Sequence, residues 1–470
     1  MKILHTSFEC YPVAKVGGLA DVVGALPKYQ NQLNIQATVV MPYYNNRYIN
    51  EVEKITVQKG KIQIENAFYE YLVYKLKNEA FDLYTIYIDG LLDRENVYGY
   101  EDETYQYVAF QLSVLDWIKS NEEKPDVIHC HDHHTSLIPF FIQYCDDYQE
   151  LKDTATVVTI HNAQYQGNFS FDKLNILPNF NHENIGILDW YGSINPMATG
   201  IKCASRVTTV SPSYMEELQQ QANGLEGLLR TEKDKCIGIL NGIDTSVWNP
   251  ETDRYLVKNF KSTSVVSGKK ANKKVLCERF GLNPDLPLFG FIGRLVGEKA
   301  ADLLPQAFAE ALEKQDINIL ALGSGHQEIE AGLEAIKDKF EGKYNVYIGY
   351  DEKLSHQIYA GSDFLIMPSR VEPCGLNQMY SLRYGTIPIV RRTGGLKDTV
   401  IDIGDNGFGI CHDQPSVWDI CYSINRAVGL YQNQKEFKRI QKQIMKIDHS
   451  WSVSAQEYIN VYKSLQTVEL

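Results

Sequence analysis

The sequence lacks the marks of several classes of protein. Its nine cysteines include no Cys-x-x-Cys pair, which fits a reducing compartment and predicts no disulfide framework. No apolar stretch is long enough to cross a bilayer, and no basic and apolar leader precedes Lys2. Acidic residues outnumber basic ones, and the resulting net charge of −13 disfavours binding to nucleic acid. We therefore expect a cytoplasmic protein without a nucleic-acid or membrane partner, whose oligomeric state the composition does not indicate.

Three catalytic fingerprints are also missing. No G-x-G-x-x-G segment is present, which disfavours an oxidoreductase that binds a dinucleotide. The chain has no G-K-[ST] segment of a P-loop and no G-x-S-x-G turn for a serine nucleophile. Any reaction must therefore use another arrangement of residues, and we expect no cofactor.

Two series of short apolar segments are present instead, and each alternates with helical stretches. This alternation is typical of parallel sheets covered by helices, and 470 residues are too many for one core. The first series is 3–7, 37–41, 127–130, 156–160 and 207–210; the second is 288–292, 317–322, 346–348, 364–367 and 387–390. The sequence predicts an α/β protein with two Rossmann-like, doubly wound domains that face each other across a cleft.

Composition along the chain predicts where the domains divide. The segment from Asn241 to Pro250 is rich in turn and cap residues, as domain junctions often are. Apolar residues at helical spacing from Trp451 onward predict a C-terminal helix. A lysine-rich segment from Lys258 to Lys274 predicts a mobile loop or frayed helix, or alternatively a contact with substrate. The predicted parts are 1–240, 241–250, 251–445 and 446–470.

An acidic turn follows one of the predicted strands of the second domain. Pro368 stops the apolar run, so the Glu372 carboxylate is expected beyond the carboxyl end of a strand, where open α/β sheets bind ligands. The next apolar run ends in Thr393, Gly394 and Gly395, small residues that let backbone N–H groups approach a phosphate. One turn would hold a sugar and the other a diphosphate. In the alternative, Glu372 is only a helix N-terminal charge and the glycines are turn residues.

Two cations are expected at the same edge of that sheet. Arg294 ends the first strand of the second domain, and Lys299 opens the next helix. Cations in this place can neutralise a diphosphate leaving group and so stabilise the charge that develops as a glycosidic bond breaks. The alternative for Lys299 is a surface ion pair with Glu298.

A glycine pair follows the first strand of the chain, within Lys15 to Leu19. Gly18 permits close approach of the backbone to a ligand, and Lys15 adds a flexible positive charge beside it. The alternative is a flexible loop with an ordinary surface lysine.

Histidines gather between His129 and His134. On a strand, His129, His131 and His133 would share one face, which is an arrangement that zinc can use, but a second group of ligands at typical spacing is missing. We therefore expect no metal and favour a hydrogen bond from a hydroxylated substrate to Asp132. His161 ends another predicted strand and reaches the same edge, although a lone histidine is often structural.

Together these segments resemble the bacterial glycogen synthase and plant starch synthase family, whose members are retaining glycosyltransferases with two Rossmann-like domains of the GT-B type. The resemblance runs over almost the whole chain, and the matching segments occur in the family's order. They are Lys15 to Leu19, His131 with Asp132, His161 with Asn162, Tyr165 to Gly167, Asn241 to Asp244, Arg294 with Lys299, Gly349 with Tyr350, Glu372 to Leu376 and Arg392 to Leu396.

The resemblance implies a role for each matching residue. The C-terminal helix would return to the first domain, and the two cations would bind the diphosphate of the donor. The full set is Arg294 and Lys299 on the diphosphate, with Lys15, Gly18, Thr393, Gly394 and Gly395 beside it; Tyr350 on the base; Glu372 with the backbone of Cys374, Gly375 and Leu376 on the glucose hydroxyls; His161 at the reacting carbon; and Asp21, Asp132, Asn162 and Asn241 on the sugar or acceptor side.

The reaction implied is transfer of glucose from ADP-glucose to the non-reducing end of an α-1,4-glucan, with retention of configuration and without a metal. UDP-glucose with a smaller acceptor, and a non-catalytic glucan-binding homologue, are the alternatives. His133 stands where the family usually has tryptophan, so the acceptor preference is open. Ala300 stands where the family usually has glycine, next to Lys299.

Overall fold

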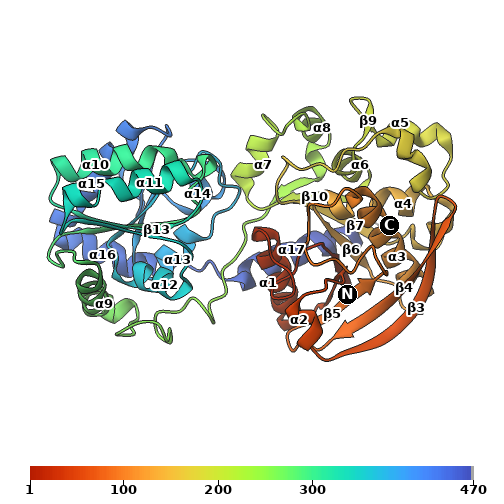
Figure 1. The fold of residues 1–470 in the computed structure, drawn as a ribbon, viewed down its shortest axis with the longest axis horizontal. Helices are drawn as coiled ribbons and strands as arrows, with labels where there is room; N and C mark the ends of the chain where they lie inside the picture. The colour runs from red at the N-terminus through yellow and green to blue at the C-terminus, as the bar shows by residue number, and fades with distance from the viewer. Residues whose placement is uncertain (467–470) are drawn as a thin grey trace. The chain divides into compact units, whose positions relative to one another are not determined.

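The computed structural model describes residues 1–466. The chain divides into two compact units, which Figure 1 draws in the colours of the sequence. Unit 1 is Met1–Asn241 together with the helix that begins at Trp451, and unit 2 is Gly242–Ser450. Each unit has its own sheet and its own buried core. Among residues 1–466, no helix combines the length and the apolar composition that a membrane span requires.

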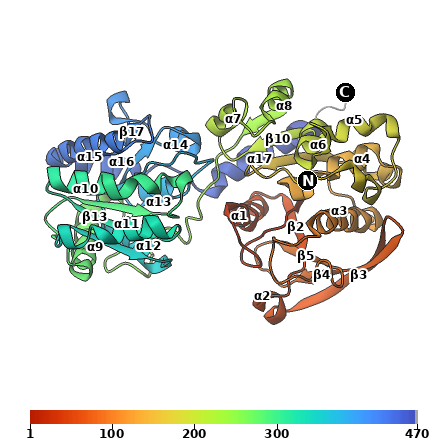
Figure 2. The same cartoon turned by 45° about the horizontal axis from the view of Figure 1, so that its top comes forward.

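Unit 1 is built on a nine-stranded sheet in the order β11-β10-β7-β6-β1-β2-β5-β4-β3. The pairs from β11 to β5 are parallel, whereas β4 is antiparallel to both β5 and β3. Figure 2 shows β4 and β3 at the outer edge of this sheet. The strands are β1 (Lys2–Thr6), β2 (Gln36–Pro42), β3 (Lys54–Ile64), β4 (Ala67–Leu76), β5 (Asp82–Tyr87), β6 (Val127–His131), β7 (Ala155–Ile160), β10 (Arg206–Thr209) and β11 (Cys236–Gly238), with a separate pair β8 (Asp189–Trp190) and β9 (Ser193–Ile194).

The helices of unit 1 cover both faces of its sheet and include the C-terminal one. They are α1 (Gly18–Gln32), α2 (Arg47–Glu51), α3 (Glu103–Ser120), α4 (Ile138–Tyr144), α5 (Ile185–Leu188), α6 (Pro196–Cys203), α7 (Pro212–Leu218), α8 (Glu226–Thr231) and α17 (Trp451–Gln466). The apolar stripe of α17 is buried against α1 and the sheet, with Trp451, Tyr458 and Tyr462 in one cluster with Ile3 and Leu26. The helix begins at Trp451, where the apolar spacing predicts it, and 467–470 lie outside the described residues.

Unit 2 is built on a six-stranded, wholly parallel sheet in the order β14-β13-β12-β15-β16-β17. Helices cover both faces, with α10, α11 and α15 on one and α9 and α12 on the other (Figure 1). Strands such as β15, with the sequence FLIM, are therefore apolar at every position. The elements are β12 (Leu288–Ile292), β13 (Asn318–Gly323), β14 (Tyr344–Ile348), β15 (Phe364–Met367), β16 (Ile387–Arg391), β17 (Ile410–His412), α9 (Val265–Phe280), α10 (Leu304–Lys314), α11 (Gln327–Ala335), α12 (Glu352–Gly361), α13 (Asn377–Arg383), α14 (Gly394–Thr399), α15 (Val417–Gln432) and α16 (Gln434–Ile444).

The structure contradicts the role expected for the lysine-rich segment from Lys258 to Lys274. Most of it belongs to α9, and two of its lysines, four residues apart, face inward. The Lys269 ammonium group donates to three backbone carbonyls and to the Thr386 hydroxyl, while Lys273 forms an ion pair with Asp363 at 2.7 Å. Burial lowers the pKa of Lys269 to about 7. The expectation of a mobile or frayed segment was wrong, because these cations are part of the core of unit 2.

Candidate active site

Two predicted site residues of unit 2 are in direct contact. Lys299 ends a short 3-10 helix after β12, and Glu372 follows β15. Because β12 and β15 are parallel neighbours, their carboxyl ends lie at the same edge of the sheet. The Lys299 ammonium nitrogen is 2.6 Å from a carboxylate oxygen of Glu372, and the Ser369 hydroxyl donates to the same oxygen at 2.9 Å. Glu372 is only 7% exposed, so the pair is a shielded cation and anion at the ligand-binding edge.

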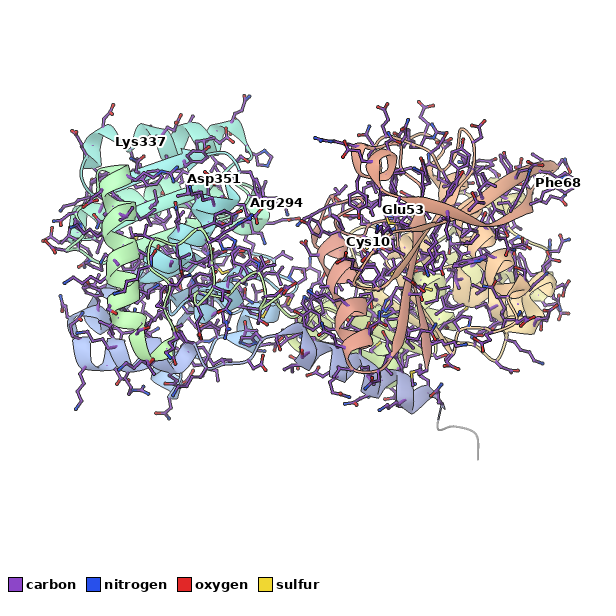
Figure 3. All side chains as sticks on the ribbon, turned by 90° about the horizontal axis from the view of Figure 1, so that it is seen from below. Cys10, Glu53, Phe68, Arg294, Lys337 and Asp351 are labelled. Atoms are coloured by element: carbon purple, nitrogen blue, oxygen red, sulfur yellow. The ribbon has the colours of Figure 1, made fainter. Side chains whose placement is uncertain are left out.

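Arg294 lies close by in the chain but in a different environment. Its side chain is exposed, as Figure 3 shows, and its guanidinium is 3.2 Å from the carboxylate of Glu298. The surface ion pair that was the alternative for Lys299 is thus made by Arg294. Such an exposed pair contributes only about 0–1 kcal/mol to stability, so Arg294 can readily exchange Glu298 for an anionic ligand.

The glycine pair of unit 2 packs against the acidic turn. A Cβ atom on Gly394 would lie 2.0 Å from the carbonyl oxygen of Glu372, and one on Gly395 would lie 2.1 Å from that of Cys374. The Gly395 N–H donates to the carbonyls of Glu372 and Pro373 at 3.1 and 3.2 Å. The close approach that the sequence assigns to a phosphate is therefore made to the protein's own turn, which holds the Glu372 segment against the start of α14.

The remaining predicted residues of unit 2 lie on turns at the same edge. Gly375 has a φ of +72°, a conformation that favours glycine, and its neighbour Cys374 is buried. Tyr350 follows β14 and is 85% exposed, so its ring is accessible to a flat ligand. Ala300 has a φ of +52° directly after Lys299, which explains why a glycine is suited to this position.

In unit 1, the loop after β1 is held by a residue that the sequence did not single out. One carboxylate oxygen of Glu9 accepts from the N–H groups of Val16 and Gly17 at 2.6 and 2.9 Å, and the other accepts from the Tyr98 hydroxyl at 2.8 Å. Glu9 is buried, although it is an acid between two apolar residues. An acid between two apolar residues just after a strand was the signal available in the sequence, and in the structure it fixes the loop that carries Lys15.

That loop ends in a second ion pair. The Lys15 ammonium nitrogen is 2.6 Å from Asp21 on the first turn of α1. A Cβ atom on Gly18 would meet no atom within 4 Å, so the space beside this glycine is open. The arrangement leaves Lys15 about half exposed and able to turn toward a ligand.

Asp132 joins the two loops that follow β6 and β7. Its φ of +57° is unusual for a residue other than glycine, and such strain concentrates at functional sites. One carboxylate oxygen accepts from the backbone N–H groups of His161 and Asn162 at 2.7 and 3.4 Å. Burial raises the pKa of Asp132 to about 7. Asp132 therefore orders the backbone at His161 with one of its carboxylate oxygens.

The histidine cluster differs from the expected one. His129 and His131 share a face with His5 of β1, whereas His133 begins a 3-10 helix, and its ring centre lies 3.8 Å from that of the tilted His134 ring. Ligand atoms of His5, His129 and His131 lie within 4.8 Å of one another, which is the spacing of a possible metal site. However, both ring nitrogens of each of these three histidines already have hydrogen-bond partners in the protein. The cluster is therefore better described as a hydrogen-bond network.

Two predicted acceptor-side residues have different partners. The Asn162 side chain accepts from the N–H of Gln164 at 2.9 Å, which shapes the loop after β7. Asn241, at the end of unit 1, is buried, and within residues 1–466 its side-chain oxygen has no hydrogen-bond partner. An unsatisfied buried oxygen is costly, so Asn241 is the one of the two with an acceptor left for a ligand.

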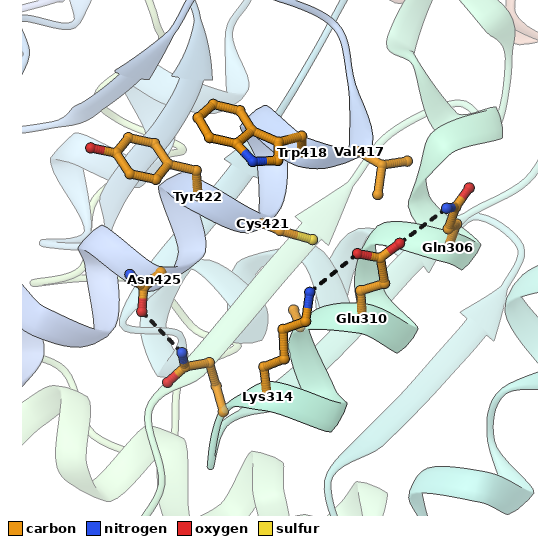
Figure 4. A pocket seen from close by; sticks show the side chains of 10 residues that line it. Gln306, Glu310, Lys314, Val417, Trp418, Cys421, Tyr422 and Asn425 are labelled. Carbon is orange, nitrogen blue, oxygen red and sulfur yellow. Dashed lines mark hydrogen bonds and ion pairs between the residues drawn. The ribbon is translucent and has the colours of Figure 1, made fainter.

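A depression of about 510 Å³ on unit 2 contains none of the predicted site residues. It lies between α10 and α15 (Figure 4), where the exposed rings of Trp418 and Tyr422 are parallel with their centres 5.1 Å apart. Its polar side chains bond to one another, as Gln315 does to Asn425 at 2.9 Å. None of the residues predicted to bind a diphosphate or a sugar lines this depression.

Comparison with known proteins agrees with this arrangement of sheets. The family described as "Starch synthase catalytic domain" matches residues 2–231, and that described as "Glycosyl transferases group 1" matches residues 272–444. These matches and the two sheets, one wholly and one largely parallel, define a two-domain glycosyltransferase of the GT-B fold. The chain belongs to the glycogen and starch synthase family.

Individual relatives are similar over their full lengths. A glycogen synthase of Flavobacterium johnsoniae is 54% identical over 466 residues, which cover 98% of each chain. A glycogen synthase of Fervidobacterium nodosum is 38% identical over 483 residues, with the same coverage. The catalytic domain of starch synthase IV from Arabidopsis thaliana, solved with ADP and acarbose, superposes with a TM-score of 0.88 at 32% identity over 99% of each chain.

More distant structures share the fold alone. A sucrose-phosphate synthase from Thermosynechococcus elongatus has a TM-score of 0.62 at 13% identity. The predicted fold class, family and type of enzyme are confirmed: the protein is a glycosyltransferase of the glycogen and starch synthase type.

Proposed function

We propose that the chain transfers glucose from ADP-glucose to the non-reducing end of an α-1,4-glucan and retains the α configuration. The observation that carries this proposal is the Lys299–Glu372 contact at the carboxyl edge of the unit 2 sheet. A cation for phosphate and a shielded carboxylate for sugar hydroxyls stand side by side there, as a nucleotide sugar requires. The starch synthase relative that binds ADP and acarbose supports both the adenine nucleotide and the glucan-like acceptor.

In this proposal, unit 2 holds the donor. Lys299 and Arg294 bind the diphosphate, Glu372 and the backbone of Cys374 to Leu376 bind the glucose hydroxyls, and Tyr350 stacks on the base. Residues Thr393 to Gly395 lie beside the diphosphate and keep the Glu372 turn in place. Lys299 and Glu372 neutralise each other at 2.6 Å, which holds both side chains in place at this edge. Such preorganisation lowers the cost of reorganisation during the reaction.

The chemical step follows from these charges. The bond between the glucose C1 and the phosphate oxygen breaks, and the acceptor hydroxyl forms a bond to C1 on the same face. The proton of that hydroxyl passes to the departing phosphate oxygen, so no enzyme carboxylate needs to act as nucleophile. Lys299 and Arg294 stabilise the negative charge that grows on the diphosphate, which is the type of interaction that enzymes use most effectively.

Unit 1 contributes the remaining groups. We place the backbone carbonyl of His161 at the reacting carbon, where it stabilises positive charge on the sugar, and Asp132 fixes that backbone through the two N–H bonds at 2.7 and 3.4 Å. Lys15 and Gly18 lie beside the diphosphate. Asp21, Asn162 and Asn241 serve the sugar and acceptor. We place the activity in the cytoplasm.

The experiment is a comparison of donors and acceptors. The purified chain is incubated with ADP-glucose or UDP-glucose labelled in the glucose, and with glycogen or with small sugars. We expect label in glycogen and a higher rate with ADP-glucose. Label found only in small products would assign the chain to a small-acceptor enzyme, and binding of glycogen without any transfer would assign it to the non-catalytic homologues.

A further inference from the structure

A continuous series of side-chain hydrogen bonds runs through unit 1 from His161 to the C-terminal helix. His161 Nε2 is 3.0 Å from His131 Nδ1, and His131 Nε2 is 3.0 Å from His5 Nδ1. His5 Nε2 is 2.8 Å from the side-chain oxygen of Gln30 on α1. The Gln30 amide nitrogen donates to the Tyr462 hydroxyl of α17 at 3.2 Å. All of these residues except His161 are fully buried.

Each imidazole in the series carries one proton. Burial lowers the pKa of His5 to about 4 and that of His161 to about 3, and it holds the pKa of His131 well below its usual value. At neutral pH, every ring therefore has one N–H donor and one bare nitrogen. Such a ring donates a hydrogen bond from one nitrogen and accepts one at the other. The position of the proton on the ring at one end of the series therefore fixes its position on the ring at the other end.

The direction is set at Gln30. Its side-chain oxygen is only an acceptor, so His5 must carry its proton on Nε2 and leave Nδ1 bare. His131 then donates from Nε2 to His5 and accepts at Nδ1 from His161. The proton of His161 is thus on Nε2, and its Nδ1 is bare. Within residues 1–466 this Nδ1 has no hydrogen-bond partner, and His161 is partly exposed.

The hydrogen bonds at the far end of the series are compatible with this orientation of Gln30. Because the Tyr462 hydroxyl accepts from Gln30, its own proton goes to His129 Nδ1 at 2.7 Å. His129 in turn has its proton on Nε2 and donates it to Thr159. Rotating the Gln30 amide by half a turn would reverse every bond and place the His161 proton on Nδ1. Through the Tyr462 hydroxyl, α17 therefore contributes to which tautomer His161 adopts.

We propose that Gln30 and Tyr462 are positioning residues that hold His161 in the tautomer with a bare Nδ1, ready to accept a hydrogen bond from a glucose hydroxyl. The inference deepens the proposed function, since it rests on His161 touching the sugar. A hydroxyl is a fitting partner because it supplies the proton that the ring lacks. Neither Gln30 nor Tyr462 touches the sugar, so both act only through the histidines between them.

The direct test is the ¹⁵N spectrum of the histidine rings in the full chain, with the His161 signals assigned by their loss in His161→Gln. In the wild-type protein we expect the pattern of a neutral ring protonated on Nε2. In Tyr462→Phe and Gln30→Met, which remove one link each at similar volume, we expect His161 to become a mixture of the two tautomers. A wild-type ring protonated on Nδ1, or a pattern that neither substitution changes, would overturn the inference.

Tyr458→Phe is the matched control. Tyr458 is also a buried tyrosine of α17, one turn before Tyr462, and its hydroxyl lies outside this series. We expect Tyr458→Phe to leave the His161 spectrum unchanged and Tyr462→Phe to lower kcat/KM for the donor by roughly 3- to 10-fold, the value of about one hydrogen bond. Equal effects of the two substitutions would show a packing role only.

The spectrum separates this inference from the proposed function. If the tautomer responds as expected but the wild-type chain transfers no glucose, the network is as described and the proposed function fails. If the chain is active and the tautomer does not respond, only the network inference fails. The wild-type spectrum, with His161 assigned through His161→Gln, already decides the tautomer even if Tyr462→Phe or Gln30→Met does not fold.

Discussion

The ammonium nitrogen of Lys299 lies 2.6 Å from a carboxylate oxygen of Glu372, although the two residues are 73 positions apart in the chain. The contact is made by two turns at the carboxyl ends of adjacent parallel strands. Glu372 is nearly inaccessible to water and Lys299 is about one-quarter exposed. The pair thus combines an accessible cation with a shielded carboxylate.

Replacing the cation should reduce catalysis without unfolding the protein. We expect Lys299→Ala to lower kcat by about 100- to 1,000-fold, because one preorganised charge at a developing anion supplies roughly 3–4 kcal/mol. Lys343→Ala is the matched control, since Lys343 also pairs with an acid, Asp316, at 2.7 Å but precedes β14 at the opposite end of the strands. A comparable loss of kcat in both variants would contradict the role of Lys299.

Replacing the anion should reveal that the two side chains act together. Glu372→Gln keeps the size and removes the charge, so we expect kcat/KM for the donor to fall by about 10- to 100-fold, the range of a hydrogen bond to a charged group. In the double variant Lys299→Ala with Glu372→Gln, we expect a smaller loss than the product of the single losses, with a coupling of at least about 1 kcal/mol. If the free-energy losses calculated from kcat/KM simply add in the double variant, the two side chains act independently and their contact has no role in the reaction.

Asp132 should make the stability of the protein depend on pH in one direction. Its pKa is about 7 in the folded chain against 3.8 as the ordinary value, so the folded state keeps a proton that the unfolded state releases. The contribution of this retained proton to the free energy of unfolding is fully present below about pH 4. It is lost as the pH rises toward 7, by on the order of 4 kcal/mol. Asp132→Asn retains an oxygen acceptor and removes this titration.

The measurement is urea unfolding of the wild-type protein and of Asp132→Asn between about pH 4 and pH 7. We expect the variant to gain stability relative to the wild-type protein steadily with rising pH. A difference that is flat, or that runs the other way, would mean that the carboxyl of Asp132 ionises normally in the fold.

The buried pair of α9 offers a test of the core of unit 2. Asp363 accepts from Lys273 at 2.7 Å and from the N–H of Leu288 at 2.8 Å, and both charged side chains are almost fully buried. Asp363→Asn leaves the Lys273 charge without a counter-charge and should cost about 3–5 kcal/mol in the free energy of unfolding. Asp316→Asn, in an exposed pair, should cost much less. Similar costs by chemical denaturation would contradict the structural role of Lys273.

Much of the fold follows from local pattern. Apolar runs of strand length in two series predict the two parallel sheets, and β12 and β15 begin and end where those runs do. The stripe from Trp451 predicts α17. The antiparallel pair β3 and β4 was not predicted, because its strands alternate between exposed and buried residues and carry several charges at the outer edge of the sheet.

The site was predictable in its residues but less so in their partners. Edge positions of parallel sheets indicate Lys299 and Glu372, yet the pairing of Arg294 with Glu298 and the packing of Gly395 on Cys374 depend on turns that no local pattern describes. The segment that contains Lys269 was misread for a similar reason, since distant carbonyls converge on this lysine and allow its burial. Long-range partners of polar groups are what the sequence does not display.

The most direct test of glucan elongation uses the purified chain, ADP-glucose labelled in the glucose, and glycogen. After the reaction, the washed polymer is digested with β-amylase, which removes maltose only from non-reducing ends joined by α-1,4 bonds. We predict that the label enters the polymer and that β-amylase then releases it as maltose. Label that never enters the polymer, or that resists β-amylase, would contradict transfer to the non-reducing end with retention of the α configuration.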